Sequence, residues 1–148
     1  MNPHFQECLK KRRIIEFPKG KKLVQKELKS AEEDIKDAKF GLSAGRFKWP
    51  TIQGYYAMCH AARALLFSRG YREKSHYCLY IALKELFVNS GLLSIDFAEA
   101  FYHAMRLREN ADYRSLYSKS SAERILKNAE ELLIRAKVIL SEDKPVQM

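Results

Sequence analysis

The chain has 148 residues, of which 47% are hydrophobic and 30% charged, and this balance is typical of one globular domain. Its 6 glycines and 4 prolines are too few for a many-stranded sheet, and it has neither an apolar signal segment near residue 1 nor an apolar run long enough to span a membrane. We therefore expect an all-α, cytoplasmic protein without a membrane segment, and its net charge of +9 points to an anionic partner.

The first 21 residues form a basic leader. Residues 1–26 contain eight lysines or arginines against two glutamates, so +6 of the net charge lies there. Apolar residues in the leader are spaced for a short helix, and Pro18 and Gly20 separate it from the rest. It could dock as an extra helix or stay mobile, and the run Lys10–Arg13 could attract phosphates or be a solvated terminus.

Amphipathic segments fill the remainder, residues 22–148, which we assign to one helical domain. Apolar residues recur there in steps of three and four, and serines or glycines mark the ends of the segments. Ser94 is a candidate N-cap, and Ser120 and Glu123 form a capping box. The expected helices span about residues 22–44, 50–70, 75–89, 94–113 and 120–141. Short connections favour an antiparallel, up-and-down bundle of four to five helices.

Arg108 breaks the apolar pattern of the fourth segment. It falls on the same stripe as Phe97 and Phe101, where an apolar residue is expected. Asp112 follows at i+4, within reach of the guanidinium, and Tyr113 lies beside it. The group is either part of a ligand site or an ion pair that only fixes packing.

Two further polar groups lie on neighbouring segments. His60 and Arg63 are one turn apart in the second helix, where His60 could equally be an ordinary core or surface histidine. Lys74, Ser75 and His76 open the third helix, whose free N–H groups favour an anion. The alternative there is simple capping by Ser75.

The cysteines and acidic residues do not suggest a metal site. Cys8, Cys59 and Cys78 are an odd number without a C-x-x-C pair, so we expect neither a disulfide framework nor a zinc site, and a reducing compartment. Glu73 and His76 match the spacing of carboxylate-bridged bundles only once, whereas such centres need two motifs. We expect no metal and no cofactor.

Several of these elements together resemble the HEPN domain family over about residues 22–140. They are the tyrosine-rich run 55–67 with Gly70, the Lys-Ser-His sequence 74–76, and Arg-Glu-Asn-Ala-Asp-Tyr at 108–113. The resemblance implies an up-and-down helical bundle that pairs as a homodimer. It also implies a genetic context in which such proteins are the toxin half of a module with a minimal nucleotidyltransferase, and hence a nucleotide or RNA ligand.

The resemblance also bears on catalysis. Catalytic members are metal-independent ribonucleases with a histidine four to six residues after the arginine. Arg108 matches that arginine, but Asp112, Tyr113 and Arg114 occupy the histidine positions. His60 or His76 could substitute only if folding brings one of them near Arg108.

We therefore expect a non-catalytic, homodimeric nucleotide- or RNA-binding module. Arg108 would contact phosphate, Asp112 would orient it and Tyr113 would stack or donate a hydrogen bond. The other candidate ligand-binding residues are Arg63, His60, Lys74 and His76. Two alternatives are a ribonuclease toxin with an altered site built on Arg108, Asp112 and Tyr113, and a purely structural interaction protein.

Overall fold

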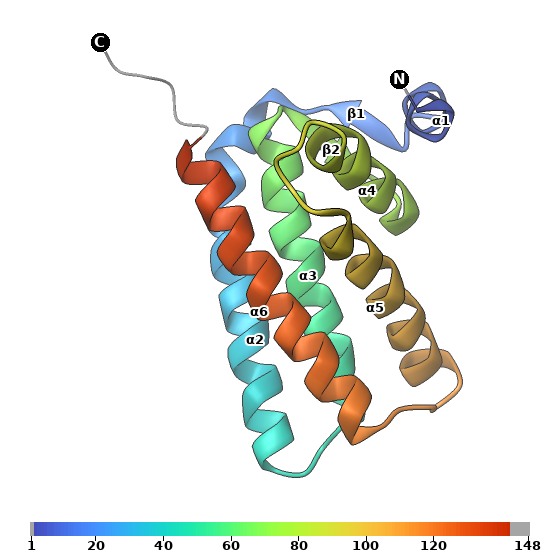
Figure 1. Cartoon of the computed structure of the whole chain (residues 1–148), viewed down its shortest axis with the longest axis vertical. Helices are drawn as coiled ribbons and strands as arrows, with labels where there is room; N and C mark the ends of the chain where they lie inside the picture. Colours follow the sequence, from blue (N-terminus) through green and yellow to red (C-terminus); the bar gives the residue numbers. More distant parts are fainter. Residues whose placement is uncertain (1, 143–148) are drawn as a thin grey trace.

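The computed structural model describes residues 2–142 and is helical apart from one two-stranded sheet (Figure 1). The elements are α1 (Pro3–Lys10), β1 (Ile14–Glu16), the 3-10 helix η1 (Pro18–Leu23), α2 (Val24–Ser43), α3 (Lys48–Ser68), β2 (Tyr71–Glu73), α4 (His76–Leu83), the π-helical turn η2 (Lys84–Val88), α5 (Ile95–Tyr113) and α6 (Lys119–Glu142). The all-α prediction is confirmed. The expected domain end at residue 148 lies outside the described residues. No helix within residues 2–142 is long and apolar enough to cross a membrane.

The long helices alternate in direction along the chain. In Figure 1, α2 runs downwards, α3 upwards, α5 downwards and α6 upwards. The central member is α3, which packs against α2, α5 and α6 and has 14 buried residues among its 21. By contrast, α2 buries one stripe of its surface, as its apolar spacing predicted. The difference identifies α3 as the core helix and α2 as a surface helix of the bundle.

A glycine sets the distance between α3 and α6. A Cβ built on Gly54 would lie 2.4 Å from Cγ2 of Ile125, so only a residue without a side chain fits at this contact. Both residues are buried. The close approach brings α6 against the central helix.

The basic leader is docked on the bundle. Phe5 and Cys8 of α1 and Ile14 of β1 are buried, with 2%, 4% and 1% of their surfaces exposed. β1 pairs antiparallel with β2, and Ile14 lies opposite Glu73. In the structure, residues 2–21 thus contain α1, β1 and most of η1, and the leader lies against the bundle.

The expectation of no disulfide was wrong. Cys8 of α1 and Cys78 of α4 are joined, with their Cα atoms 5.9 Å apart, a usual separation for a bridged pair. The two residues are 70 positions apart in sequence and are brought together by the β1–β2 pairing, which spacing alone does not show. Cys59 is free and buried in α3. The three cysteines therefore form one disulfide and one free, buried thiol.

Helix caps agree with the sequence at two ends and differ at a third. The Ser75 and Ser94 side chains accept hydrogen bonds from the N–H groups of Cys78 and Asp96, as N-caps do. α6 begins earlier than the predicted capping box, at Lys119. The N–H of Ser121 donates to Ser118 Oγ at 3.1 Å, so Ser118 replaces Ser120 as the capping residue.

This difference leads to a simple test. We expect Ser118→Ala to lower the free energy of unfolding by about 1 kcal/mol, because the first turn of α6 loses its side-chain acceptor. Ser120→Ala is the matched control and should change stability by less than about 0.5 kcal/mol. Urea unfolding of both variants gives the comparison, and a larger loss in Ser120→Ala would restore the capping box predicted from the sequence.

Candidate functional site

Arg108 lies across the interface between α5 and α3. Its Nη2 donates a hydrogen bond to Tyr56 Oη at 2.8 Å and lies 3.3 Å from Asp112 Oδ2. The guanidinium carbon is 5.4 Å from the ring centres of Tyr56 and Tyr113 and 5.9 Å from that of Tyr55. The side chain is 16% exposed, and its buried Nε has no hydrogen-bond partner among the described residues. Aromatic and acidic groups thus fix the position of the guanidinium, and its Nε–H donor has no described acceptor.

The surroundings keep this arginine charged. Burial alone would lower the pKa of Arg108, but the nearby Tyr56, Tyr113 and Asp112 outweigh burial and raise it. A delocalised guanidinium over aromatic faces is also stabilised by cation–π attraction. The site therefore presents a fixed positive charge at all physiological pH values.

His76 contacts the same tyrosine pair from α4. Its Nδ1 lies 2.8 Å from Tyr55 Oη, and its ring centre is 5.6 Å from that of Tyr55 and 6.4 Å from that of Tyr56. Burial lowers the pKa of His76, the nearby Arg108 lowers it further, and Glu73 opposes both. The structure therefore places a neutral histidine and a charged arginine on the same two aromatic rings.

The shared tyrosines make the two residues electrostatically dependent. We expect the pKa of His76 to lie below the ordinary histidine value of about 6.5, and to rise in Arg108→Ala because a positive neighbour is removed. An NMR titration of the imidazole signals measures this. Arg106→Ala, on the exposed face of α5, is the control and should leave the His76 titration unchanged. An identical titration in wild type and Arg108→Ala would contradict the shared site.

His60 and Arg63 belong to a different cluster, between α3, α2 and β2. His60 Nδ1 lies 2.5 Å from Glu27 Oε2, and its Nε2 is 3.5 Å from Asp34 Oδ2. Arg63 binds Glu73 through Nε at 3.1 Å and Nη2 at 2.9 Å. These two predicted site residues are engaged with acidic partners, and neither has a described contact with the Tyr55–Tyr56 pair.

Lys74 and Ser75 occupy the start of α4 as expected. The N–H of Lys74 donates to the carbonyl of Arg13 at 2.7 Å, its side chain is exposed, and the Ser75 hydroxyl caps the helix. His76 follows directly and is the residue of this trio that reaches the tyrosines. Capping by Ser75 is therefore present, and Lys74 is exposed at the start of α4 without a described contact to Arg108 or its tyrosines.

Tyr113 connects Arg108 to the surface of the bundle. Its ring contacts the guanidinium and is 72% exposed. It also borders a depression of about 400 Å³ on the C-terminal half of α5, lined by Arg106, Glu109, Asn110, Tyr113 and Arg114. A ligand group in this depression could lie against an aromatic face beside two further cations.

Sequence reasoning missed the central role of Tyr55 and Tyr56. Arg108 and His76 meet on this pair, although it was not among the predicted site residues. Burial raises the pKa of Tyr55, so its hydroxyl stays protonated. The available signal was a pair of tyrosines in an otherwise apolar helix, which marks polar groups that need partners.

The chain is a small all-α domain in which an arginine of α5 pairs with an aspartate one turn later and contacts a tyrosine of the core helix α3. The HEPN domain profile matches residues 24–139, so the chain belongs to the HEPN family. A UPF0332 protein of Archaeoglobus fulgidus is 33% identical over 120 residues, 79% of this chain and 94% of that protein. A protein of Methanocaldococcus jannaschii named "Putative toxin MJ0605" is 28% identical over 120 residues, 80% of this chain and 90% of its own length.

Proposed function

We propose that the chain is a non-catalytic HEPN module that binds a nucleotide or RNA through phosphate contacts to Arg108. The observation that carries this proposal is the Arg108 guanidinium, which stays charged, is held by Tyr56 and Asp112, and lies against the exposed ring of Tyr113. Guanidinium groups bind phosphate oxygens through paired N–H donors. An arginine positioned in this way is better suited to an anion than to packing alone.

Neighbouring groups supply the rest of the proposed site. The exposed ring of Tyr113 can stack on a base, and such stacking contributes about 1–3 kcal/mol per base. The neutral His76 can form a hydrogen bond with a ribose hydroxyl through Nε2, and the exposed Lys74, two residues earlier, adds positive charge at the start of α4. Asp112 keeps the guanidinium oriented along α5.

We also propose that the module is a homodimer and works with a separate partner, a minimal nucleotidyltransferase. Support for pairing comes from exposed large apolar side chains in the segment after α5, Leu116 and Tyr117, with 60% and 49% of their surfaces exposed. Support for a two-component context comes from the relative in Methanocaldococcus jannaschii, whose name includes the word toxin.

One specific observation favours a second candidate, metal-independent RNA cleavage. The histidine that is missing after Arg108 could be supplied by His76, because both residues contact the Tyr55–Tyr56 pair. Incubation of RNA with concentrated protein in a chelator discriminates the two candidates. Cleavage that disappears in both Arg108→Ala and His76→Ala would establish the enzyme, and intact RNA supports the binding module.

The binding proposal is tested by titrating the protein with ATP and with a short single-stranded RNA at two salt concentrations. We expect Arg108→Ala to weaken binding by about tenfold or more, since charge-assisted hydrogen bonds are lost. Arg46→Ala, an exposed arginine between α2 and α3 that does not line the depression beside Tyr113, is the control. A variant with glutamine at positions 10–13 removes the charge of the basic run and keeps α1 in the chain, so it measures how much of the affinity comes from the leader.

Two outcomes would contradict the proposal. If only the glutamine variant loses affinity, the leader alone attracts the ligand and the Arg108 site is not involved. If Arg108→Ala binds as tightly as wild type but dissociates into monomers, Arg108 and Asp112 act only in the subunit interface, as a structural interaction protein requires.

A further inference from the structure

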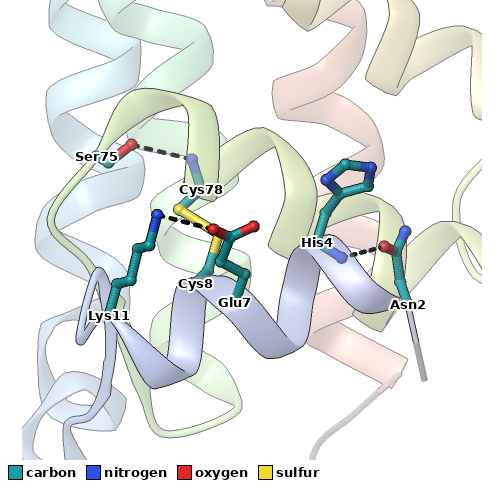
Figure 2. Close-up of a disulfide and its surroundings, with 7 residues drawn as sticks. All are labelled: Asn2, His4, Glu7, Cys8, Lys11, Ser75 and Cys78. Carbon is teal, nitrogen blue, oxygen red and sulfur yellow. Dashed lines mark hydrogen bonds and ion pairs between the residues drawn. A yellow bond between two sulfur atoms is a disulfide. The ribbon is translucent and has the colours of Figure 1, made fainter.

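The N-terminal helix lies outside the residues that match the family profile and is joined to them by a disulfide. The family profile begins at residue 24, whereas α1 spans Pro3–Lys10. Figure 2 shows α1 lying along α4, with the bond between Cys8 and Cys78 joining the two helices. The sheet formed by β1 and β2 is the second attachment of the leader. This helix thus has one reversible chemical link to the domain.

Apart from the disulfide, few contacts hold α1 against the rest of the domain. Phe5 is its one fully apolar side chain in the core, and Leu9 is partly buried. The N–H of Asn2 reaches Glu85 Oε1 at the long distance of 3.4 Å. An isolated helix of eight residues is too short to persist in water. The connection to β1 passes through Arg12, whose φ of +56° ends α1 in a left-handed C-cap, with the N–H groups of Arg12 and Arg13 donating to the carbonyls of Leu9 and Cys8.

The bridge is largely buried, with Cys8 4% and Cys78 1% exposed, but both cysteines line a small opening at the surface beside cationic groups. This opening is a surface pocket of about 100 Å³. The other residues of this pocket are His4, Glu7, Lys11, Arg13 and Tyr77. Lys11 and Arg13 favour negative charge on sulfur, although Lys11 is also paired with Glu7 at 2.7 Å. Cys78 lies in the first turn of α4, where the free N–H groups of the helix stabilise an anion.

We propose that the Cys8–Cys78 bond is a redox-controlled clamp, which a dithiol opens to release α1 from α4 while the bundle stays folded. One thiolate of the dithiol attacks a sulfur of the bridge and forms a mixed disulfide, and the other cysteine leaves as a thiolate that takes up a proton. The second thiol of the reagent then attacks the mixed disulfide, frees the remaining cysteine and leaves as a cyclic disulfide. Two electrons and two protons pass from the dithiol to the protein.

Most of the core lies outside α1. The buried residues of α1 are Phe5 and Cys8, whereas the other members of the core cluster come from β1 and from the segments from α2 to α6, and the β1–β2 ladder pairs Ile14–Glu16 with β2 independently of the bridge. Reduction therefore turns residues 2–13, including the basic run Lys10–Arg13, into a mobile arm tethered at β1. The inference is independent of any ligand at Arg108.

Hydrogen–deuterium exchange of the full chain, air-oxidised and then treated with dithiothreitol, tests the clamp. Peptide mapping of the oxidised protein must first show Cys8 joined to Cys78. We then expect the amides of residues 6–10, the first α1 amides bonded within the helix, to exchange about tenfold faster or more after reduction, with α3 and α6 amides unchanged. Cys8→Ser should show the fast exchange without reductant, and Cys59→Ala, which leaves the bridge intact, should behave as wild type.

Three results would overturn the clamp. The first is the absence of a Cys8–Cys78 peptide in the oxidised protein. The second is unchanged protection of residues 6–10 in both the reduced protein and Cys8→Ser, which would show that α1 stays docked without the bond. The third is equal loss of protection in α1 and α3 on reduction, because the bond would then hold the whole fold rather than one helix.

Discussion

Replacing Glu73 by leucine is expected to lower the free energy of unfolding by about 3–5 kcal/mol, since it leaves a largely buried arginine without its main partner. Glu73 lies on β2 and is 7% exposed, and both of its carboxylate oxygens accept hydrogen bonds from Arg63. Glu27 lies 3.7 Å from the same guanidinium and is too distant to replace these bonds. Urea or thermal unfolding of Glu73→Leu measures the loss.

A surface ion pair provides the matched control. Lys39 and Glu130 lie 3.5 Å apart with their side chains 57% and 39% exposed, so Glu130→Leu should change stability by less than about 1 kcal/mol. The double variant Arg63→Met with Glu73→Leu should recover most of the loss, because an apolar pair leaves no buried charge. A Glu73→Leu protein as stable as wild type would show that the Arg63–Glu73 pair does not support the fold.

Gly54→Val is expected to cost about 3 kcal/mol by forcing α3 and α6 apart. The first added atom would already lie 2.4 Å from Cγ2 of Ile125, and that side chain is buried and cannot move into solvent. Overpacking at such contacts costs about 1–3 kcal/mol, and valine adds two further methyl groups. Gln53→Val, one residue earlier and half-buried, is the control and should cost much less.

The outcome is measured by chemical unfolding of both variants. Gly54→Val combined with Ile125→Ala should lose less stability than the sum of the two single changes, because the smaller partner makes room for the valine. If Gly54→Val unfolds at the same denaturant concentration as wild type, the close approach of the two helices is not required for the packing.

Local patterns in the sequence were sufficient to predict most of the helices. The apolar residues of the 22–44 segment, spaced by three and four, include the five that α2 buries, Val24, Leu28, Ala31, Ile35 and Ala38. Periodicity reports which face of a helix is buried, and this is a local property. The disulfide and the β1–β2 ladder depend on contacts between residues far apart in sequence, and a single sequence does not encode their pairing visibly.

The candidate site, like the fold, was predictable from the sequence only where its contacts are local. Arg108 and Asp112 meet because residues four apart face each other on a helix, so their pairing could be inferred. The contacts of Arg108 with Tyr56 and of His76 with Tyr55 cross between helices and required the fold. His60 and Arg63 were expected at the site from their residue types, but the carboxylates of α2 and β2 engage them elsewhere.

The most direct test of the phosphate-binding proposal is an NMR titration that follows the arginine Nε–H and histidine ring signals as ATP is added. We predict saturable shifts of the Arg108 Nε–H and the His76 ring at the same ligand concentration, because both groups border one site. Shifts confined to Lys10–Arg13, with the Arg108 Nε–H unmoved at saturation, would contradict the central role of Arg108.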